Sequence, residues 1–260
     1  MSTEFRKELD LFPTFLFLRL KSVVESWQVW SLRSSKRVRA CHMDTSFSYA
    51  SERRVMVESQ LKKRGIIDPR VLEVMERLPR HLFVPDEFRE RAYEDHALPI
   101  GIDQTISQPY IVALMTEILQ IEPDDTVLEI GTGSGYQAAV LAELAKQVYT
   151  IERYEELAER AKGILQELGY QNIEVIAGDG TLGLPEKAPF EKIIVTAGAP
   201  EIPTALIDQL KEGGRLVIPV GRRFAQTLRV VRKEGQKTIE EESIRCAFVP
   251  LVGIYGWARE

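Results

Sequence analysis

Three glycines that follow a short apolar run, with an acid inside that run, form the stretch of this chain with the clearest chemical meaning. The run is Val127–Ile130, and Gly131, Gly133 and Gly135 come directly after it. Glycines there let the chain turn tightly and let a ligand approach bare backbone. Glu129 stands two residues before the first glycine. A carboxylate at that place repels a pyrophosphate at short range but attracts a cationic group.

The glycine spacing separates this stretch from two other nucleotide-binding motifs. A dinucleotide fingerprint reads G-x-G-x-x-G and aims at a pyrophosphate, whereas this chain has G-x-G-x-G. No Gly-Lys-Ser or Gly-Lys-Thr follows, which excludes a P-loop. A ligand with a cationic end fits better, and the ammonium and sulfonium groups of S-adenosylmethionine (SAM) provide one. A structural turn that binds nothing is the alternative, because a lone glycine motif is weak support for a site.

Two more acids strengthen the prediction of a ligand. Glu152 lies about 20 residues past the glycines, where a carboxylate can accept hydrogen bonds from both hydroxyls of an adenosyl ribose. Asp179 stands between Gly178 and Gly180, where an acid can accept from the exocyclic amine of adenine. Alone, Glu152 could be a solvated acid in a first helical turn, and Asp179 could belong to a plain turn. Three acids at the ends of three consecutive predicted strands favour a common ligand, because ligands of open α/β sheets bind there.

The elements that must position these acids follow from the period of the apolar residues. Strand, glycine turn and helix at 126–146 form the first half of a nucleotide-binding βαβ unit. Strands are predicted at 126–130, 147–151, 173–177, 190–196, 215–220, 227–232 and 244–249, and the charged stretch 233–242 is predicted as a solvated tip. Helices are predicted at 53–64, 69–78, 111–119, 136–146, 154–168 and 203–211, the second with Asp68 as its N-cap, and 79–85 is predicted as extended.

The segment 93–109 is long and irregular, and it ends where a helix is predicted to begin. Long irregular segments inside compact domains are usually functional. Ser107 or Thr105 can cap the following helix, and Thr105 with Gln108 has the spacing of a capping box. From these residues alone, an N-cap is the slightly favoured role for Ser107.

Composition excludes several classes of protein. Apolar and charged contents of 44% and 28% are typical of a globular soluble protein, and a net charge of −5 argues against a protein built mainly to bind nucleic acid. Cys41 and Cys246 are far apart, which fits a reducing compartment. Together with His42, His81 and His96 they show no metal-ligand spacing. We therefore predict no metal site.

Residues 1–43 differ in character from the rest of the chain. Leu11–Leu18 is too short to span a bilayer, and Pro13 interrupts it. The acids before it and the lack of a cleavage site do not fit a signal peptide. We interpret 1–43 as a poorly ordered extension, or as the result of a start site assigned too early, in which case translation begins at Met43. A membrane-surface helix is the less favoured alternative. Residues 44–260 are predicted to form one domain with a helical lead-in.

Six stretches make the chain resemble the protein-L-isoaspartate O-methyltransferases, a family of SAM-dependent repair enzymes. They are Leu78–Pro85, Leu98–Gly101, Gln104–Tyr110, Val127–Gln137, Gly178–Gly180 and Gly213–Gly221. In order they cover most of the chain, from Met56 to Gly253. Many methyltransferases share the glycine motif, whereas Gln-Thr-Ile-Ser-Gln-Pro, within Gln104–Tyr110, is specific to this family and carries the assignment.

The resemblance implies both a fold and a reaction. The fold is α/β, a doubly wound SAM-methyltransferase (Rossmann-like) sheet that is mostly parallel, with antiparallel pairing of the C-terminal strands. The reaction is methyl transfer from SAM to the free α-carboxylate of an L-isoaspartyl residue in a damaged protein or peptide, which leaves S-adenosyl-L-homocysteine. The methyl ester promotes return to the succinimide, from which a normal aspartyl residue can form.

At the matching positions the resemblance implies that Ser107 is the active-site serine. The cofactor-binding residues expected from the motif and the resemblance together are Gln104, Thr105, Ile106, Glu129, Gly131, Gly133, Gly135, Glu152, Asp179, Gly180 and Gln226. Ile102 and Asp103 depart from the smaller residues that the family leads us to expect just before its specific motif. The shape of that loop therefore stays open.

The chemistry of the implied acceptor agrees with the residues. A carboxylate is an anionic nucleophile at neutral pH, so it needs no general base, and the chain offers no convincing one. The enzyme must instead align oxygen, methyl and sulfur, and positioning of that kind can supply roughly 7–11 kcal/mol. We hypothesise that Ser107 holds the acceptor carboxylate by a hydrogen bond and is not a covalent nucleophile.

Two other functions stay open at this stage. One is a SAM methyltransferase that acts on RNA or a small metabolite; the acidic balance and the lack of an Asn-Pro-Pro-Tyr motif count against methylation of nucleic-acid nitrogens. The other is a module that senses adenosyl ligands without catalysis, which the intact Gln104–Ser107 segment disfavours. We expect a monomeric, cytoplasmic enzyme that acts on damaged proteins, binds no nucleic acid and has no stable membrane insertion.

Overall fold

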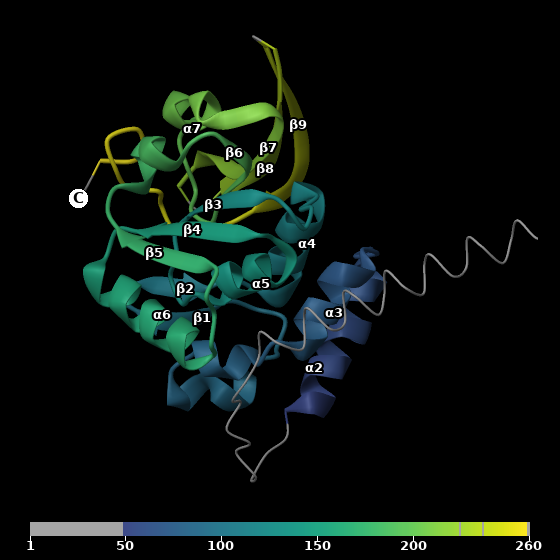
Figure 1. The fold of residues 1–260 in the computed structure, drawn as a ribbon. Helices are drawn as coiled ribbons and strands as arrows, with labels where there is room; N and C mark the ends of the chain where they lie inside the picture. Colours follow the sequence, from purple (N-terminus) through teal and green to yellow (C-terminus); the bar gives the residue numbers. More distant parts are fainter. Residues whose placement is uncertain (1–48, 224, 236, 259–260) are drawn as a thin grey trace, which may run out of the picture. The chain divides into compact units, whose positions relative to one another are not determined.

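A seven-stranded sheet runs through the described part of the chain in the order β5-β4-β3-β6-β7-β8-β9 (Figure 1). The structure is a computed structural model that describes residues 49–223, 225–235 and 237–258, so the expectations for residues 1–43 lie outside it. The sheet strands are β3 (Thr126–Ile130), β4 (Gln147–Glu152), β5 (Ile173–Ala177), β6 (Phe190–Val195), β7 (Leu210–Arg222), β8 (Ala225–Glu234) and β9 (Lys237–Cys246). A separate antiparallel hairpin consists of β1 (Leu98–Gly101) and β2 (Gln104–Ile106).

The direction of the strands confirms the predicted fold class. β5, β4, β3, β6 and β7 are parallel to one another, whereas β8 pairs antiparallel with β7 and β9 pairs antiparallel with β8. The chain places β4 on one side of β3 and later places β6 on the other. A reversal of this kind opens a crevice outside the carboxyl ends of the strands, and ligands of doubly wound sheets bind in it.

Two apolar clusters, one on each face, hold the sheet between its helices. The helices are α2 (Ala50–Met56), α3 (Pro69–Arg77), α4 (Pro109–Leu119), α5 (Tyr136–Leu144), α6 (Glu155–Glu167) and α7 (Thr204–Asp208). Val127 and Val148 join the cluster that includes side chains of α3 to α6. Their strand neighbours Leu128 and Ile151 join the second cluster with α7, because side chains of a strand alternate between faces. None of the helices described is long and apolar enough to cross a membrane.

The helical lead-in forms largely as predicted. α2 continues through a π-helical turn at Val57–Leu61 and a 3-10 turn at Lys62–Arg64, and Gly65 ends it. The Asp68 carboxylate accepts from the backbone N–H of Arg70 at 2.8 Å, which confirms the predicted N-cap of α3. The prediction of an extended segment at 79–85 is wrong in its middle. Arg80–Phe83 forms a 3-10 turn between two prolines.

Two sequence predictions for the C-terminal third are wrong. The predicted helix 203–211 ends at Asp208, and residues 210–214 belong to β7, where Leu210 pairs with Phe190 across a bulge. The segment 233–242 is largely exposed, as predicted, but most of it is strand, because β8 extends to Glu234 and β9 runs from Lys237 to Cys246. The predicted strand at 244–249 is thus only the end of β9. Its glutamates Glu240–Glu242 are exposed on the last strand of the sheet. Charges on an edge strand discourage pairing with other chains, so the charge run marks an edge and not a turn.

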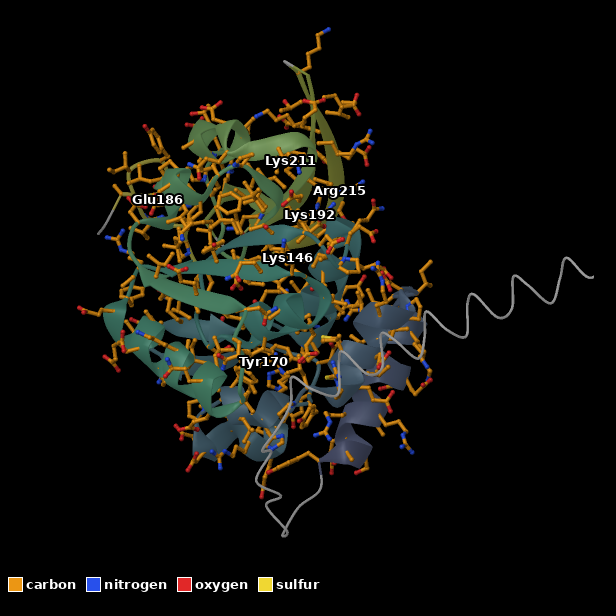
Figure 2. The ribbon with its side chains drawn as sticks, viewed as in Figure 1. Lys146, Tyr170, Glu186, Lys192, Lys211 and Arg215 are labelled. Carbon is orange, nitrogen blue, oxygen red and sulfur yellow. The ribbon has the colours of Figure 1, made fainter. Side chains whose placement is uncertain are left out.

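Ion pairs gather at the amino ends of the parallel strands. Lys192 pairs with Asp125 at 3.7 Å, and Lys211 pairs with Glu191 at 2.7 Å; both lysines are labelled in Figure 2. Arg215, also labelled there, donates to the carbonyl of Ile118 near the end of α4. These contacts join β6 to β7, β6 to the loop before β3, and β7 to α4, at the ends of the strands opposite the crevice.

A matched pair of glycine substitutions tests the packing of α5 against α6. Gly135 is the N-cap of α5 with φ +85°, and an added Cβ would lie 3.2 Å from Cβ of Ala161 in α6. Gly163 lies within α6, and an added Cβ there meets nothing within 4 Å. We expect Gly135→Ala to lower the free energy of unfolding by about 1–2 kcal/mol. We expect Gly163→Ala to raise it by about 0.5–1 kcal/mol. Urea unfolding of both variants measures the two signs, and a loss of stability in Gly163→Ala would contradict the assigned packing.

Candidate active site

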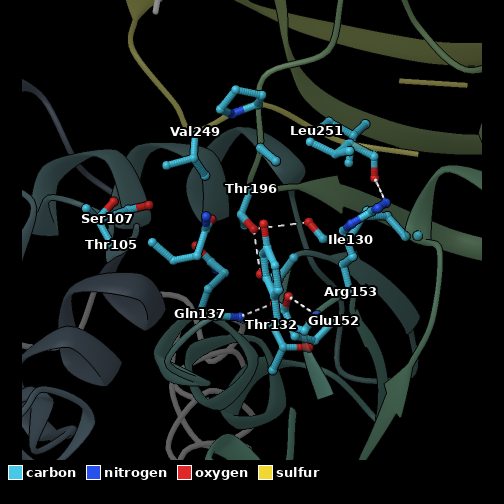
Figure 3. A pocket seen from close by; sticks show the side chains of 18 of the residues that line it. Thr105, Ser107, Ile130, Thr132, Gln137, Glu152, Arg153, Thr196, Val249 and Leu251 are labelled. Carbon is cyan, nitrogen blue, oxygen red and sulfur yellow. Dashed lines mark hydrogen bonds between the residues drawn. The ribbon is translucent and has the colours of Figure 1, made fainter. Parts of the chain in front are cut away.

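A cavity of about 600 Å³ opens at the carboxyl ends of β3, β4 and β6, within the size range of small-ligand sites. Of the predicted site residues, the cavity is lined by Gln104, Thr105, Ile106, Ser107, Gly131, Gly133, Glu152 and Gly180, and not by Glu129, Gly135, Asp179 or Gln226. Figure 3 shows Thr105 and Ser107 on one side and Glu152 and Arg153 on the other. The fold thus brings together residues from two distant parts of the sequence.

The glycine loop lets backbone, rather than side chains, form one wall. Gly131 has φ +99°, and an added Cβ would lie 2.5 Å from the Thr196 hydroxyl oxygen. That hydroxyl donates to the carbonyls of Ile130 and Gly131. An added Cβ on Gly180 would lie 2.4 Å from a methyl group of Ile130. Any larger residue at Gly131 or Gly180 would therefore displace a neighbour at the cavity wall.

Glu152 is the carboxylate that faces the cavity. The Gly133 N–H donates to Oε2 at 2.8 Å, and the Tyr154 N–H donates to Oε1 at 2.9 Å. The residue is only 6% exposed. A carboxylate has about four lone-pair sites, so each oxygen can accept a further hydrogen bond. Two backbone donors thus fix an acceptor that can take two adjacent hydroxyls of a ligand.

Glu129 lies behind the wall and does not line the cavity. It is fully buried, and the Thr150 hydroxyl donates to its Oε2 at 2.6 Å. Thr150 in turn shares a 2.7 Å hydrogen bond with Thr132, while Oε1 has no partner among the described residues. Burial raises the pKa of Glu129 to about 8, and the charge of Glu152 acts in the same direction. Burial thus favours the uncharged form of Glu129, and its carboxyl group does not face the cavity.

Asp179 and Gln226 are occupied by neighbouring protein groups. Oδ1 of Asp179 accepts from the N–H and hydroxyl of Thr181, and Oδ2 accepts from the N–H of Ile254 at 2.9 Å. Burial opposes ionisation of Asp179, but these hydrogen bonds hold its pKa below the usual value. Oε1 of Gln226 accepts from the N–H of Phe248 at 2.9 Å. Both side chains attach the C-terminal segment to the sheet.

The role of Ser107 as a helix cap is wrong. Helix α4 begins with Gln108 as its N-cap, which makes no side-chain cap bond, and Thr105 lies within β2. Because α4 begins at Pro109, the N-cap position belongs to Gln108 and Ser107 lies one residue before it. The Ser107 hydroxyl makes no hydrogen bond with the described residues. Its side chain is free to bind a ligand at the cavity wall.

The loop whose shape the sequence left open is a tight hairpin. Ile102 and Asp103, between β1 and β2, have φ values of +52° and +53°. Two left-handed residues are typical of the two-residue turns whose twist suits a hairpin. Aspartate tolerates this conformation, whereas a β-branched isoleucine is strained in it. Asp103 also lines the cavity.

Sequence reasoning missed the cavity wall formed by the C-terminal segment. Val249–Val252 line the cavity, and Arg153 donates to the carbonyl of Val252 at 2.9 Å. No sequence motif marks these residues, because they form the cavity wall through their position and their backbone groups and not through a characteristic side chain. Thr132 and Gln137, which also line it, stand inside the glycine motif and could have been included. The described residues hold no group of three or more His, Cys, Asp and Glu side chains that could bind a metal ion.

The raised pKa of Glu129 predicts a pH-dependent stability. Between its ordinary pKa of 4.5 and about 8, the folded protein holds a proton that the unfolded chain has released. Stability therefore falls as pH rises through this window, by at most about 1.4 kcal/mol per pH unit. Glu129→Gln, which cannot ionise, should gain stability relative to the unsubstituted protein steadily from pH 5 to 8. Urea unfolding of both proteins at each pH measures this difference, and a constant difference would mean that Glu129 is already ionised at pH 5.

Comparison with known proteins agrees with the geometry. A family model described as protein-L-isoaspartate(D-aspartate) O-methyltransferase matches residues 51–255. Protein-L-isoaspartate O-methyltransferase 1 of Syntrophobacter fumaroxidans is 58% identical over 214 residues, which cover 82% of this chain and 98% of that protein. The protein-L-isoaspartate O-methyltransferase of Methanoregula boonei is 54% identical over 215 residues, 83% of this chain and 99% of that protein.

Solved structures give the same result. A protein-L-isoaspartate O-methyltransferase matches with a TM-score of 0.71 and 31% identity, over 78% of this chain and 67% of that one. A Plasmodium falciparum structure, described as such an enzyme in complex with S-adenosyl-L-homocysteine, matches with a TM-score of 0.67 and 25% identity, over 78% of this chain and 98% of that one. This chain belongs to the protein-L-isoaspartate(D-aspartate) O-methyltransferase family.

Proposed function

We propose that this protein transfers the methyl group of SAM to the free α-carboxylate of L-isoaspartyl residues in damaged proteins and peptides, which starts their repair through a succinimide. One observation carries the proposal. Ser107, with a hydroxyl that no described residue occupies, lies across a single cavity from the Glu152 carboxylate. One side can hold an anionic acceptor while the other holds an adenosyl ligand.

The residues on the Glu152 side fit SAM. Both oxygens of Glu152 keep acceptor capacity for the two ribose hydroxyls, since each receives one backbone N–H. Gly131 and Gly180 present bare backbone to the cavity, and a Cβ at either position would clash with Thr196 or Ile130 in the wall. When bound, SAM supplies a methyl group on a positively charged sulfur, and loss of that group leaves S-adenosyl-L-homocysteine. The related Plasmodium falciparum structure contains this product.

The residues on the Ser107 side suit an acceptor that is already ionised. No histidine, cysteine or lysine is among the described residues that line the cavity, so none can act there as a neutral-pH base. A carboxylate needs none, because it is anionic at neutral pH. We propose that Ser107 donates its hydroxyl proton in a hydrogen bond to one carboxylate oxygen. The other oxygen then forms the bond to the methyl carbon as the methyl–sulfur bond breaks.

We also propose that the enzyme works as a cytoplasmic monomer and does not bind nucleic acid. The net charge of −5 disfavours nucleic acid as a partner. Among the exposed large apolar side chains of the described residues, Val55, Ile67, Ile102 and Ile239 stand on separate elements, whereas Ile254 and Tyr255 are consecutive. Monomeric proteins typically expose such residues singly.

A pair of peptides tests the activity directly. One peptide carries an L-isoaspartyl residue and its twin carries a normal aspartyl residue, and both are offered with methyl-labelled SAM. We expect a base-labile methyl ester on the isoaspartyl peptide and only background label on the twin. Label on RNA, or on neither peptide, would contradict the proposed function.

Ser107→Ala tests the role of the hydroxyl. A hydrogen bond to a charged group contributes enough that its loss should lower kcat for the isoaspartyl peptide roughly 10- to 100-fold. The dissociation constant of SAM, measured by calorimetry, should change less than about twofold because the cofactor binds across the cavity. Ser59→Ala, which removes an exposed hydroxyl on a distant helical turn, is the matched control. An equal loss of SAM affinity in Ser107→Ala would make Ser107 mainly a structural residue.

A further inference from the structure

A buried arginine lies directly behind the Ser107 loop. Arg80 is fully buried. Its Nε donates to the carbonyl of Ala92 at 2.7 Å, and one terminal nitrogen donates to the carbonyl of Ser107 at 2.8 Å. The guanidinium lies 4.9 Å from the ring centre of Tyr136, and Tyr136 lines the cavity. The charge is therefore one hydrogen bond from Ser107 and one aromatic ring from the cavity.

No described carboxylate compensates this charge. Arg80 forms no ion pair with the described residues, and its other terminal nitrogen is buried without a hydrogen-bond partner. Burial lowers the pKa of Arg80 to about 10, which still leaves it protonated at neutral pH. Arg77, a half-buried arginine, differs in this respect because it pairs with the buried carboxylate of Glu143.

An isolated buried charge opposes folding, because the desolvation of the ion is not repaid by a counter-ion. Two backbone carbonyls could be joined by a neutral amide side chain at lower cost. The fold nevertheless keeps a guanidinium here, and the residue it holds is the one proposed to bind an anionic acceptor. Retention of an uncompensated cation at this place indicates that both the shape and the charge of Arg80 are used.

We propose that Arg80 is a positioning residue for the acceptor: its fork fixes the Ser107 loop against Ala92, and its unpaired positive charge attracts the acceptor carboxylate to this side of the cavity. This inference deepens the proposed function and rests on it. The two contributions are separable. The fork depends on the planar geometry of arginine, whereas the attraction depends only on a positive charge, which lysine also carries.

Two substitutions separate fork from charge. Arg80→Lys keeps the charge but loses the fork, so kcat for the isoaspartyl peptide should fall about tenfold while KM stays within about twofold. Arg80→Met loses both, so kcat should fall similarly and KM should rise about tenfold. The dissociation constant of SAM should stay within about twofold in both. Hydrogen exchange at 104–108 should become faster in both, because the Ser107 carbonyl loses its donor.

Arg215→Met is the matched control. Arg215 is a half-buried arginine that also donates to a backbone carbonyl, that of Ile118, near the opposite end of α4. It lies outside the cavity lining. We expect it to lose stability while KM, kcat and exchange at 104–108 remain those of the unsubstituted enzyme.

The outcomes discriminate clearly. A folded Arg80→Met with unchanged KM and unchanged exchange overturns the proposal, and so does a loss of SAM affinity as large as the rise in KM. An equal rise of KM in Arg80→Lys overturns the role of the charge. If Arg80→Met does not fold, Arg80→Lys alone tests the proposal. Unchanged kcat and unchanged hydrogen exchange at 104–108 in that variant would show that the two hydrogen bonds of Arg80 do not position the Ser107 loop. If the unsubstituted protein does not methylate the isoaspartyl peptide, the proposed function fails, while the exchange measurement still tests whether Arg80 holds the Ser107 loop.

Discussion

The site depends on the two hydrogen bonds that the Glu152 carboxylate accepts from backbone. One donor is Gly133 in the glycine loop and the other is Tyr154, just before α6. The Gly133 bond connects the loop after β3 to the end of β4, next to the reversal of strand order between β3 and β6, and the Tyr154 bond fixes the same carboxylate from the other side. Backbone donors and a buried carboxylate form a charge-assisted pair stronger than neutral hydrogen bonds. The acceptor for a ligand is therefore in place before any ligand arrives.

Position along a strand explains why only one of the three predicted acids faces the cavity. Glu152 is the last residue of β4, where its side chain can turn into the crevice. Glu129 lies one residue before the end of β3 and alternates with Ile130, so it points among the helices of one face. Asp179 follows β5, the outermost parallel strand, and turns toward Ile254. The sequence could place all three acids near strand ends. It could not show which of their carboxylates would be bonded to neighbouring protein groups and which would face the cavity.

Other differences between expectation and structure have the same origin. The glycine motif and the order of elements followed from local pattern, since period and turn residues are local properties, whereas the mostly parallel sheet was expected from the resemblance to the family. The cap role of Ser107 failed because Pro109 starts the helix one residue later than a serine cap would need. The charged stretch before Glu242 reads as a loop by composition, yet a sheet edge tolerates the same charges. The wall at Val249–Val252 had no local signal, because only tertiary contacts bring it to the site.

That wall has a consequence for the folding of the enzyme during its synthesis on the ribosome. Residues 249–252 and Ala258 line the cavity, and Trp257 closes back onto the carbonyl of Gly198. Synthesis proceeds from the amino end, so the parallel strands can emerge and pair while this last stretch is still inside the exit tunnel. A nascent chain thus carries a cofactor crevice with one side missing. A chain interrupted before residue 249 would keep all the strands of the sheet but lack this wall of the cavity.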